Sequence, residues 1–254
     1  MIHLFIAIIS ACCMLGGALL GMWLQPRLPK DHLSKDSHET INFGIGVIAT
    51  VTALVIGLMV SSAKSTYDTL NAGVVAASAN IILLDQALSN YGPEAKPVRE
   101  QLRALVNASL ERLWPEPSTS TTEILNSLKR TNDLANLQQQ LNQLTPQSDQ
   151  QRKALAEAAQ IAGEMMHSRW VLIEEAQIQF PTTLLVMLLF WLTFIFCVFG
   201  LFAQRNATVG VVMLACILSM ACAIFLITDL NQPLVGYIKL SSVPMRDALA
   251  QLGQ

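Results

Sequence analysis

The chain has 254 residues, of which 52% are hydrophobic and only 13% are charged, and its mean hydropathy is +0.45. Soluble domains carry about 25% charged residues, so this composition excludes an ordinary soluble globular protein. The formal net charge of −2, together with the lack of a long basic run, argues against a nucleic-acid partner.

The deficit of charge comes from four apolar blocks, each long enough to cross a bilayer. They cover residues 2–24, 41–63, 180–203 and 207–228. Apart from cysteines, their only ionisable side chain is His3, at the edge of the first block. A charge at the centre of a membrane helix costs about 2.5–3.5 kcal/mol, so its absence predicts four membrane-spanning helices, with the lipid bilayer as their partner.

The first two spans occupy residues 1–63 and are joined by a polar link, residues 25–40. The first block lacks a basic start and is longer than the apolar part of a signal peptide, so we expect an uncleaved helix. The link contains two prolines and charges of both signs, which are typical of a loop.

Residues 64–179 form a polar insertion with helical periodicity and almost no strand signal. The spacing predicts that the second span continues outward to about Asn90, where Tyr91-Gly92-Pro93 ends it. A helical hairpin and a last helix that leads into the third span follow, over about residues 93–113, 124–144 and 149–179. The predicted fold is therefore all-α: four membrane helices, and a polar bundle formed by extensions of the second and third spans plus an inserted hairpin.

Residues 180–228 form the hairpin of the third and fourth spans, because only three residues join these two blocks. Residues 229–254 are expected to form an interfacial segment and a short amphipathic helix. Asp229, Asn231 and Arg246 surround the last membrane exit, where charged hydrogen bonds would anchor the C-terminal segment.

One stripe of the second span carries only small residues. Its members follow one another at steps of three or four: Gly46, Thr50, Ala53, Gly57 and Ser61. Such a stripe serves either close packing of helices or a path for a polar solute, and the spacing leaves both roles open. In a pore, Thr50 and Ser61 would present hydroxyls, Lys64 would form a positive vestibule, and neighbouring Ile or Leu would form a dewetting constriction. In a homo-oligomer each of these groups would repeat as a ring.

The motifs of common enzymes are missing, so we expect no enzymatic activity. The sequence contains no P-loop, G-x-S-x-G or H-E-x-x-H motif and no Cys/His nucleophile pair. The five cysteines all lie in apolar blocks and have no zinc or disulfide spacing. Glu164 and His167 match half of a di-iron signature, but the second pair is missing. We therefore predict neither a metal nor another cofactor.

Three stretches resemble the bacterial bestrophin-like domain family: residues 61–103, the Trp114-Pro115 pair, and residues 228–249. The similarity extends over nearly the whole chain. The family is named for a distant likeness to bestrophin anion channels, so the resemblance implies a homopentamer with four membrane helices per subunit. It further implies that the second helix lines a pore for small inorganic anions such as chloride, and that both termini and the helical domain are cytoplasmic.

The chain departs from bestrophins in two places. Near the position of the acidic calcium-binding run of eukaryotic bestrophins, only Asp229 is present, and in place of three aromatic neck residues there is Phe43 alone. Two function classes are carried forward. The first is a homo-oligomeric, anion-favouring ion channel of the bacterial inner membrane. The second is a membrane-anchored helical scaffold or sensor whose polar bundle binds a protein partner. Basic residues near the membrane ends are balanced between the two sides, so orientation rests on the resemblance.

Overall fold

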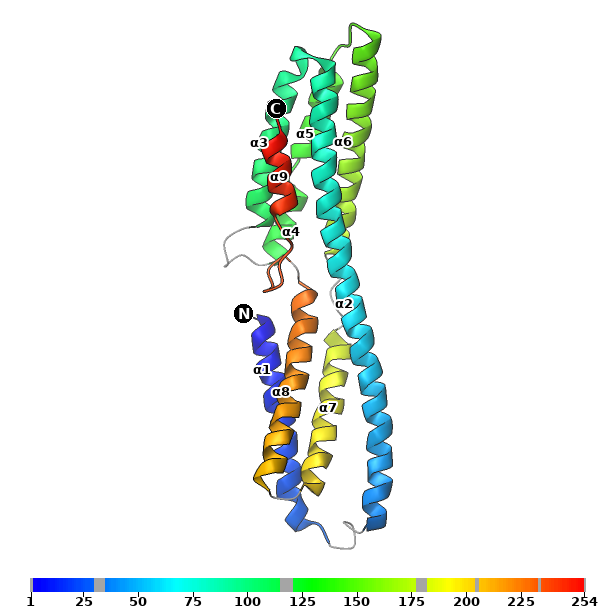
Figure 1. Cartoon of the computed structure of the whole chain (residues 1–254), viewed down its shortest axis with the longest axis vertical. Helices are drawn as coiled ribbons and strands as arrows, with labels where there is room; N and C mark the ends of the chain where they lie inside the picture. Colours follow the sequence, from blue (N-terminus) through cyan, green and yellow to red (C-terminus); the bar gives the residue numbers. More distant parts are fainter. Residues whose placement is uncertain are drawn as a thin grey trace. The chain divides into compact units, whose positions relative to one another are not determined.

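The computed structural model describes residues 2–29, 35–114, 121–176, 182–203, 206–232 and 234–253. These residues form helices and turns and contain no strand, which confirms the predicted all-α fold (Figure 1). The chain divides into two compact units, which we describe separately. The membrane unit comprises Met1–Ser65 and Phe180–Asn231, and the polar unit comprises Thr66–Gln179 and Gln232–Gln254.

The membrane unit contains four helices that are long and apolar enough to cross a bilayer. They are α1 (Ile2–Leu24), the first part of α2 (Lys35–Tyr91), α7 (Thr182–Phe202) and α8 (Ala207–Leu230). This confirms the four predicted spans. After α1 a short 3-10 turn (Gln25–Arg27) places the Arg27 guanidinium 3.3 Å from the centroid of the Trp23 ring, a cation–π contact.

Glycines allow α1 and α7 to approach closely. A Cβ at Gly21 would lie 1.9 Å from the carbonyl oxygen of Cys197, and a Cβ at Gly200 would lie 2.0 Å from that of Ala18. No other residue fits at these backbone-to-backbone contacts. Small residues thus serve helix packing here, as is usual in membrane bundles.

The polar unit contains the second part of α2, α3 (Lys96–Leu113), α4 (Thr121–Arg130), α5 (Asp133–Gln143), α6 (Asp149–Glu175) and α9 (Val243–Gln251). As predicted, α2 continues beyond the second apolar block and ends at Tyr91; Gly92 follows it with φ of 120°, a conformation that favours glycine. Ser148 caps α6 by accepting a hydrogen bond from the backbone N–H of Gln151 at 3.1 Å. The core of the unit is formed by fully buried residues of α2, α3 and α5: Leu84, Leu88, Leu102, Val106, Leu137 and Leu141.

One predicted helix is two helices in the structure. The expected helix over 124–144 is interrupted after Arg130, and α5 begins at Asp133. The guanidinium of Arg169, from α6, donates hydrogen bonds to the carbonyl oxygens of Leu128 and Thr131, the latter at 2.7 Å. A continuous helix would use these oxygens for its own backbone bonds, so a contact with another helix ends α4 at this point.

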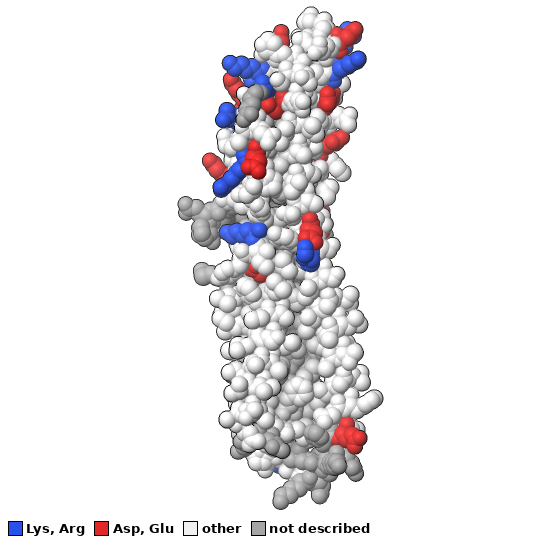
Figure 2. Space-filling view, viewed as in Figure 1, with Lys and Arg blue, Asp and Glu red and all other residues white. Residues whose placement is uncertain are grey.

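Two helix boundaries bear on the predicted organisation. Helix α2 begins at Lys35, inside the stretch expected to be a loop. Helix α6 ends at Glu175 and α7 begins at Thr182, and the Phe180-Pro181 junction lies outside the described residues. A continuous helix from the polar bundle into the third span therefore remains a prediction. On the face shown in Figure 2, charged side chains gather over the polar unit, whereas the surface of the membrane helices is nearly free of them.

Candidate functional site

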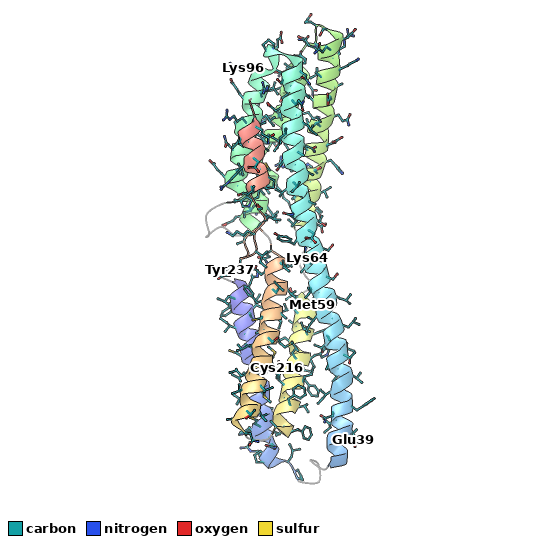
Figure 3. The ribbon with its side chains drawn as sticks, viewed as in Figure 1. Glu39, Met59, Lys64, Lys96, Cys216 and Tyr237 are labelled. Carbon is teal, nitrogen blue, oxygen red and sulfur yellow. The ribbon has the colours of Figure 1, made fainter. Side chains whose placement is uncertain are left out.

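The candidate site is on the part of α2 that belongs to the membrane unit. One face of this helix packs inside the chain through Ile45, Thr52, Met59 and Ala63, all of which are buried. Met59, labelled in Figure 3, joins a cluster from α1, α7 and α8, and Ile45 contacts residues of α7. The Thr52 hydroxyl donates to the carbonyl oxygen of Ile48 at 2.7 Å, so this polar residue is accommodated on the packed face.

The small-residue stripe lies on a different face of α2. All of its members are exposed in the single chain: Gly46, Thr50, Ala53, Gly57 and Ser61. A Cβ added at Gly46 or at Gly57 would meet no other atom within 4 Å. The contrast with Gly21 and Gly200 is direct, because those glycines lie against the backbone of a neighbouring helix. Packing against another helix of the same chain therefore does not account for the stripe.

The hydroxyl of Thr50 is already used as a donor. It donates to the carbonyl oxygen of Gly46 at 2.8 Å, the usual back-bond of threonine in a membrane helix. A hydroxyl that donates to its own helix offers lone pairs to a solute, not a proton. In this rotamer, Thr50 can accept from water but cannot donate to an anion.

Large apolar side chains flank the stripe. Phe43, Val47, Val51, Leu54 and Leu58 are all exposed, with Leu54 at 65% and Leu58 at 63%. The isoleucines of the same segment point elsewhere, since each is at least half buried within the membrane unit. Of the residue types expected at a constriction, only the leucines are thus available on the open side of α2.

Lys64 is exposed and lies seven residues, or two helical turns, beyond Gly57 (Figure 3). It therefore follows the stripe on the same side of the helix, at the end of the membrane unit. A ring of such ammonium groups, one from each copy, would raise the local concentration of anions.

The three residues predicted to anchor the C-terminal segment are divided between the two units. Asp229 is fully buried in the last turn of α8, and Asn231 follows that helix as its C-cap. Arg246 is exposed on α9, in the polar unit. Their joint role in anchoring the C-terminal segment remains a prediction.

An ion pair that contacts the C-terminal end of the chain was not predicted from the sequence. Arg99 makes a two-pronged contact with Asp85, at 2.7 and 2.8 Å, and the backbone N–H of Gly253 donates to the same carboxylate at 3.3 Å. Burial alone would raise the pKa of Asp85, but hydrogen bonds from Arg99 and Gly253 and the charge of Arg99 together lower it. The one available signal was that Asp85 lies among apolar residues of a predicted helix. A buried aspartate requires a partner, but the sequence does not show which residue the partner is.

A second polar group connects the helices of the inserted hairpin. Arg112 of α3 binds Asp133 of α5 at 2.6 Å. The guanidinium of Arg169 lies in the same region, and burial lowers its pKa, with the charge of Arg112 acting in the same direction and that of Asp133 opposing it. The side chains of Glu164 and His167, by contrast, are exposed, and Glu164 accepts a hydrogen bond from Gln160 at 3.0 Å. The described residues contain no group of three His, Cys, Asp or Glu that could hold a metal ion.

Comparisons with known proteins identify the family. The bestrophin-like domain family matches residues 12–245, nearly the whole chain. Two crystal structures share the fold, each with a TM-score of 0.65: a membrane protein carrying a proline-to-alanine substitution, at 12% identity, and a bacterial bestrophin homologue from Klebsiella pneumoniae carrying a leucine-to-threonine substitution, at 14% identity. The first likeness covers 99% of both chains, and the second covers 96% of this chain and 99% of the other. No curated protein matches the sequence. The family match and the four apolar helices together establish that the chain is a membrane protein of the bestrophin-like family.

Proposed function

We propose that this chain is one subunit of a homo-oligomeric, anion-favouring ion channel in which the small-residue stripe of α2 lines the pore. The observation that carries the proposal is the open environment of the stripe. A Cβ added at Gly46 or Gly57 would meet no atom within 4 Å, and Thr50 and Ser61 are exposed, although other faces of the same helix are packed or carry large apolar groups. Large apolar groups suit lipid or an apolar constriction, whereas glycine, threonine and serine suit water or a closely approaching helix.

A second exposed face of α2 supports assembly of several copies. In the polar unit, Ala72, Val75, Ala79 and Leu83 are exposed, with Val75 and Leu83 each at 48%. No charged residue occurs between Asp68 and Asp85. An uncharged apolar face of this length on a helix outside the membrane marks a protein contact, and a second copy of the same chain is the simplest partner. Several copies joined along α2 would bring their stripes around one axis; the likeness to bestrophins suggests five.

The preference for anions rests on Lys64 and not on the threonine hydroxyl. Thr50 donates to its own helix and so cannot donate to an anion, whereas Lys64 follows the stripe on the same side of α2 and carries a positive charge. Leu54 and Leu58 would form the apolar constriction next to Gly57, where a pore gates by dewetting. We place the channel in the bacterial inner membrane, with the polar unit and both termini cytoplasmic, by analogy with the family.

The proposal is tested by anion flux from liposomes that contain the purified protein. Gly57→Leu adds a bulky side chain to the stripe, and the subunit itself has room for it, so we expect a normal fold and a flux reduced by at least about tenfold. The matched control is Gly44→Leu, on a different side of the same helix and also with no atom within 4 Å of an added Cβ, which should leave flux unchanged.

Two outcomes would argue against a channel: a monomeric mass in detergent, or silent liposomes with the native sequence. Equal flux through both leucine variants would argue against the stripe as the pore wall. Absence of flux with the native sequence would leave the membrane-anchored scaffold as the better interpretation. Replacing Lys64 with glutamate should shift the ratio of chloride to potassium permeability toward potassium. Orientation is tested separately by labelling E111C, exposed on α3, with an impermeant thiol reagent in a background without native cysteines.

A further inference from the structure

The polar unit contains a partly open cavity that the channel proposal does not use. Its volume is about 140 Å³, and it is lined by residues of α2, α3, α4, α5, α6, α9 and the chain that precedes α9. Most of its wall is apolar and includes Leu70, Val74, Leu105, Leu134, Met165 and Leu172. Such walls offer water few hydrogen-bond partners.

The cavity also has ionisable groups in its wall. Among its described lining residues these are Arg112, Asp133 and Arg169. Arg112 and Asp133 form the ion pair at 2.6 Å, which is about one-third exposed on each side. Two guanidinium groups and one carboxylate leave one net positive charge beside an apolar space.

Arg169 contributes the excess charge. Its hydrogen bonds go to the carbonyl oxygens of Leu128 and Thr131, which are neutral groups. Burial lowers the pKa of Arg169, as expected for a cation withdrawn from water, although the nearby Asp133 partly opposes this. An anion that entered the cavity would therefore be attracted by the two arginines.

The volume limits the apolar part of an occupant. An engineered apolar cavity of about 150 Å³ binds one benzene molecule, so this cavity has room for one ring or a chain of about six carbons. A hydrated inorganic anion would find too few polar partners on the apolar wall, and an uncharged hydrocarbon would leave the positive charge unused. The cavity is therefore complementary to a molecule that has both parts.

We propose that this cavity binds a small organic carboxylate with an apolar body about the size of a benzene ring, the carboxylate meeting Arg112 and Arg169. The site is in the polar unit and does not depend on conduction. A channel, a scaffold or a sensor could each carry it.

Benzoate is the probe, and binding to the full chain in detergent is measured by saturation-transfer NMR and by titration of the thermal unfolding temperature. Benzyl alcohol has the ring without the charge, and acetate has the charge without the ring. We expect benzoate to bind at least about tenfold more tightly than either, because a charge-assisted hydrogen bond and the filled apolar space both contribute.

Two pairs of variants separate the site from partition into the detergent. Arg112→Gln removes a lining charge, and we expect benzoate to bind about tenfold more weakly; Arg103→Gln makes the same change at an exposed position of α3 and should have no effect. Ala77→Leu places a larger side chain in the cavity and should abolish binding, whereas Ala104→Leu, exposed on α3, should not.

Loss of benzoate binding in Arg112→Gln and Ala77→Leu but not in their controls would support the site. If Arg112→Gln fails to fold, the Ala77→Leu pair still decides the question. The proposal is overturned if benzoate binds all variants equally, if acetate or benzyl alcohol binds as tightly as benzoate, or if millimolar benzoate does not bind at all.

Discussion

Gly21 and Gly57 both lie on membrane helices, yet the structure predicts opposite responses to alanine. A Cβ at Gly21 would lie 1.9 Å from the carbonyl oxygen of Cys197 and 2.7 Å from the backbone nitrogen of Leu201. Ordinary contacts of a Cβ begin near 3.4 Å, so α1 and α7 would have to separate by about 1.5 Å. The obstructing atoms belong to the backbone, so rotation of a side chain cannot relieve the clash.

The free energy of unfolding follows from these contacts. Overpacking of a well-packed interior costs about 1–3 kcal/mol, and a backbone clash belongs at the upper end of that range. Alanine regains about 1 kcal/mol of helix propensity relative to glycine, so Gly21→Ala should destabilise the chain by about 2 kcal/mol. Gly57→Ala meets nothing within 4 Å and should leave stability unchanged or raise it by up to about 1 kcal/mol.

The measurement is unfolding of both variants in mixed micelles, followed by circular dichroism, with the oligomeric mass recorded alongside. Equal stability of Gly21→Ala and the native chain, within about 0.5 kcal/mol, would show that α1 and α7 do not approach as described. A loss of stability or of oligomeric mass in Gly57→Ala would show that the stripe packs against a helix of another copy, and the pore-lining proposal would then fail.

Three further predictions concern the polar unit. Arg99→Gln leaves the Asp85 carboxylate without its cation; because Arg99 is one-quarter exposed, we expect a loss of about 1–2 kcal/mol, measured by urea unfolding. Because the pKa of Asp85 is lowered in the folded chain, this pair contributes its full stability above the unfolded pKa near 3.8. The contribution should decline as the pH falls below that value and be lost as the pH passes through the lower folded pKa; a pH-independent difference between Arg99→Gln and the native chain would contradict this. Trp114→Phe removes the hydrogen bond from the indole N–H to the Leu240 carbonyl, 2.8 Å long, and should cost about 1 kcal/mol and speed amide exchange after residue 234. Leu137→Ala empties a fully buried position and should cost about 2–5 kcal/mol, whereas a value near zero would mean that α5 is not part of the core.

Local signals predicted much of the fold. Uncharged runs of sufficient length identified four membrane helices, and Gly92 with the following proline marked the end of α2 at Tyr91. The expected terminal helix appears as α9, which has Pro244 in its first turn. Each of these features depends on residues that are adjacent or one helical turn apart, so the sequence alone is sufficient.

Features that depend on distant residues were not predictable in the same way. The break between α4 and α5 depends on Arg169, 38 residues beyond Thr131 in the chain. The partner of Asp85 is Arg99, which lies across a turn and could equally have faced solvent. Neither the cavity nor its net positive charge can be inferred before the helices are assembled, because each helix contributes only part of the wall.

The small-residue stripe shows which features the sequence determines and which only the tertiary structure determines. Its spacing is a property of one helix, so the order of residues 46–61 was enough to place five small residues on one side of α2. Which side of α2 is buried depends on α1, α7 and α8, and only their packing showed that Ile45 and Met59 face inward while Gly46 and Gly57 remain open. The order of residues in the chain determines which of them share one face of a helix, whereas the neighbouring helices determine which face is buried.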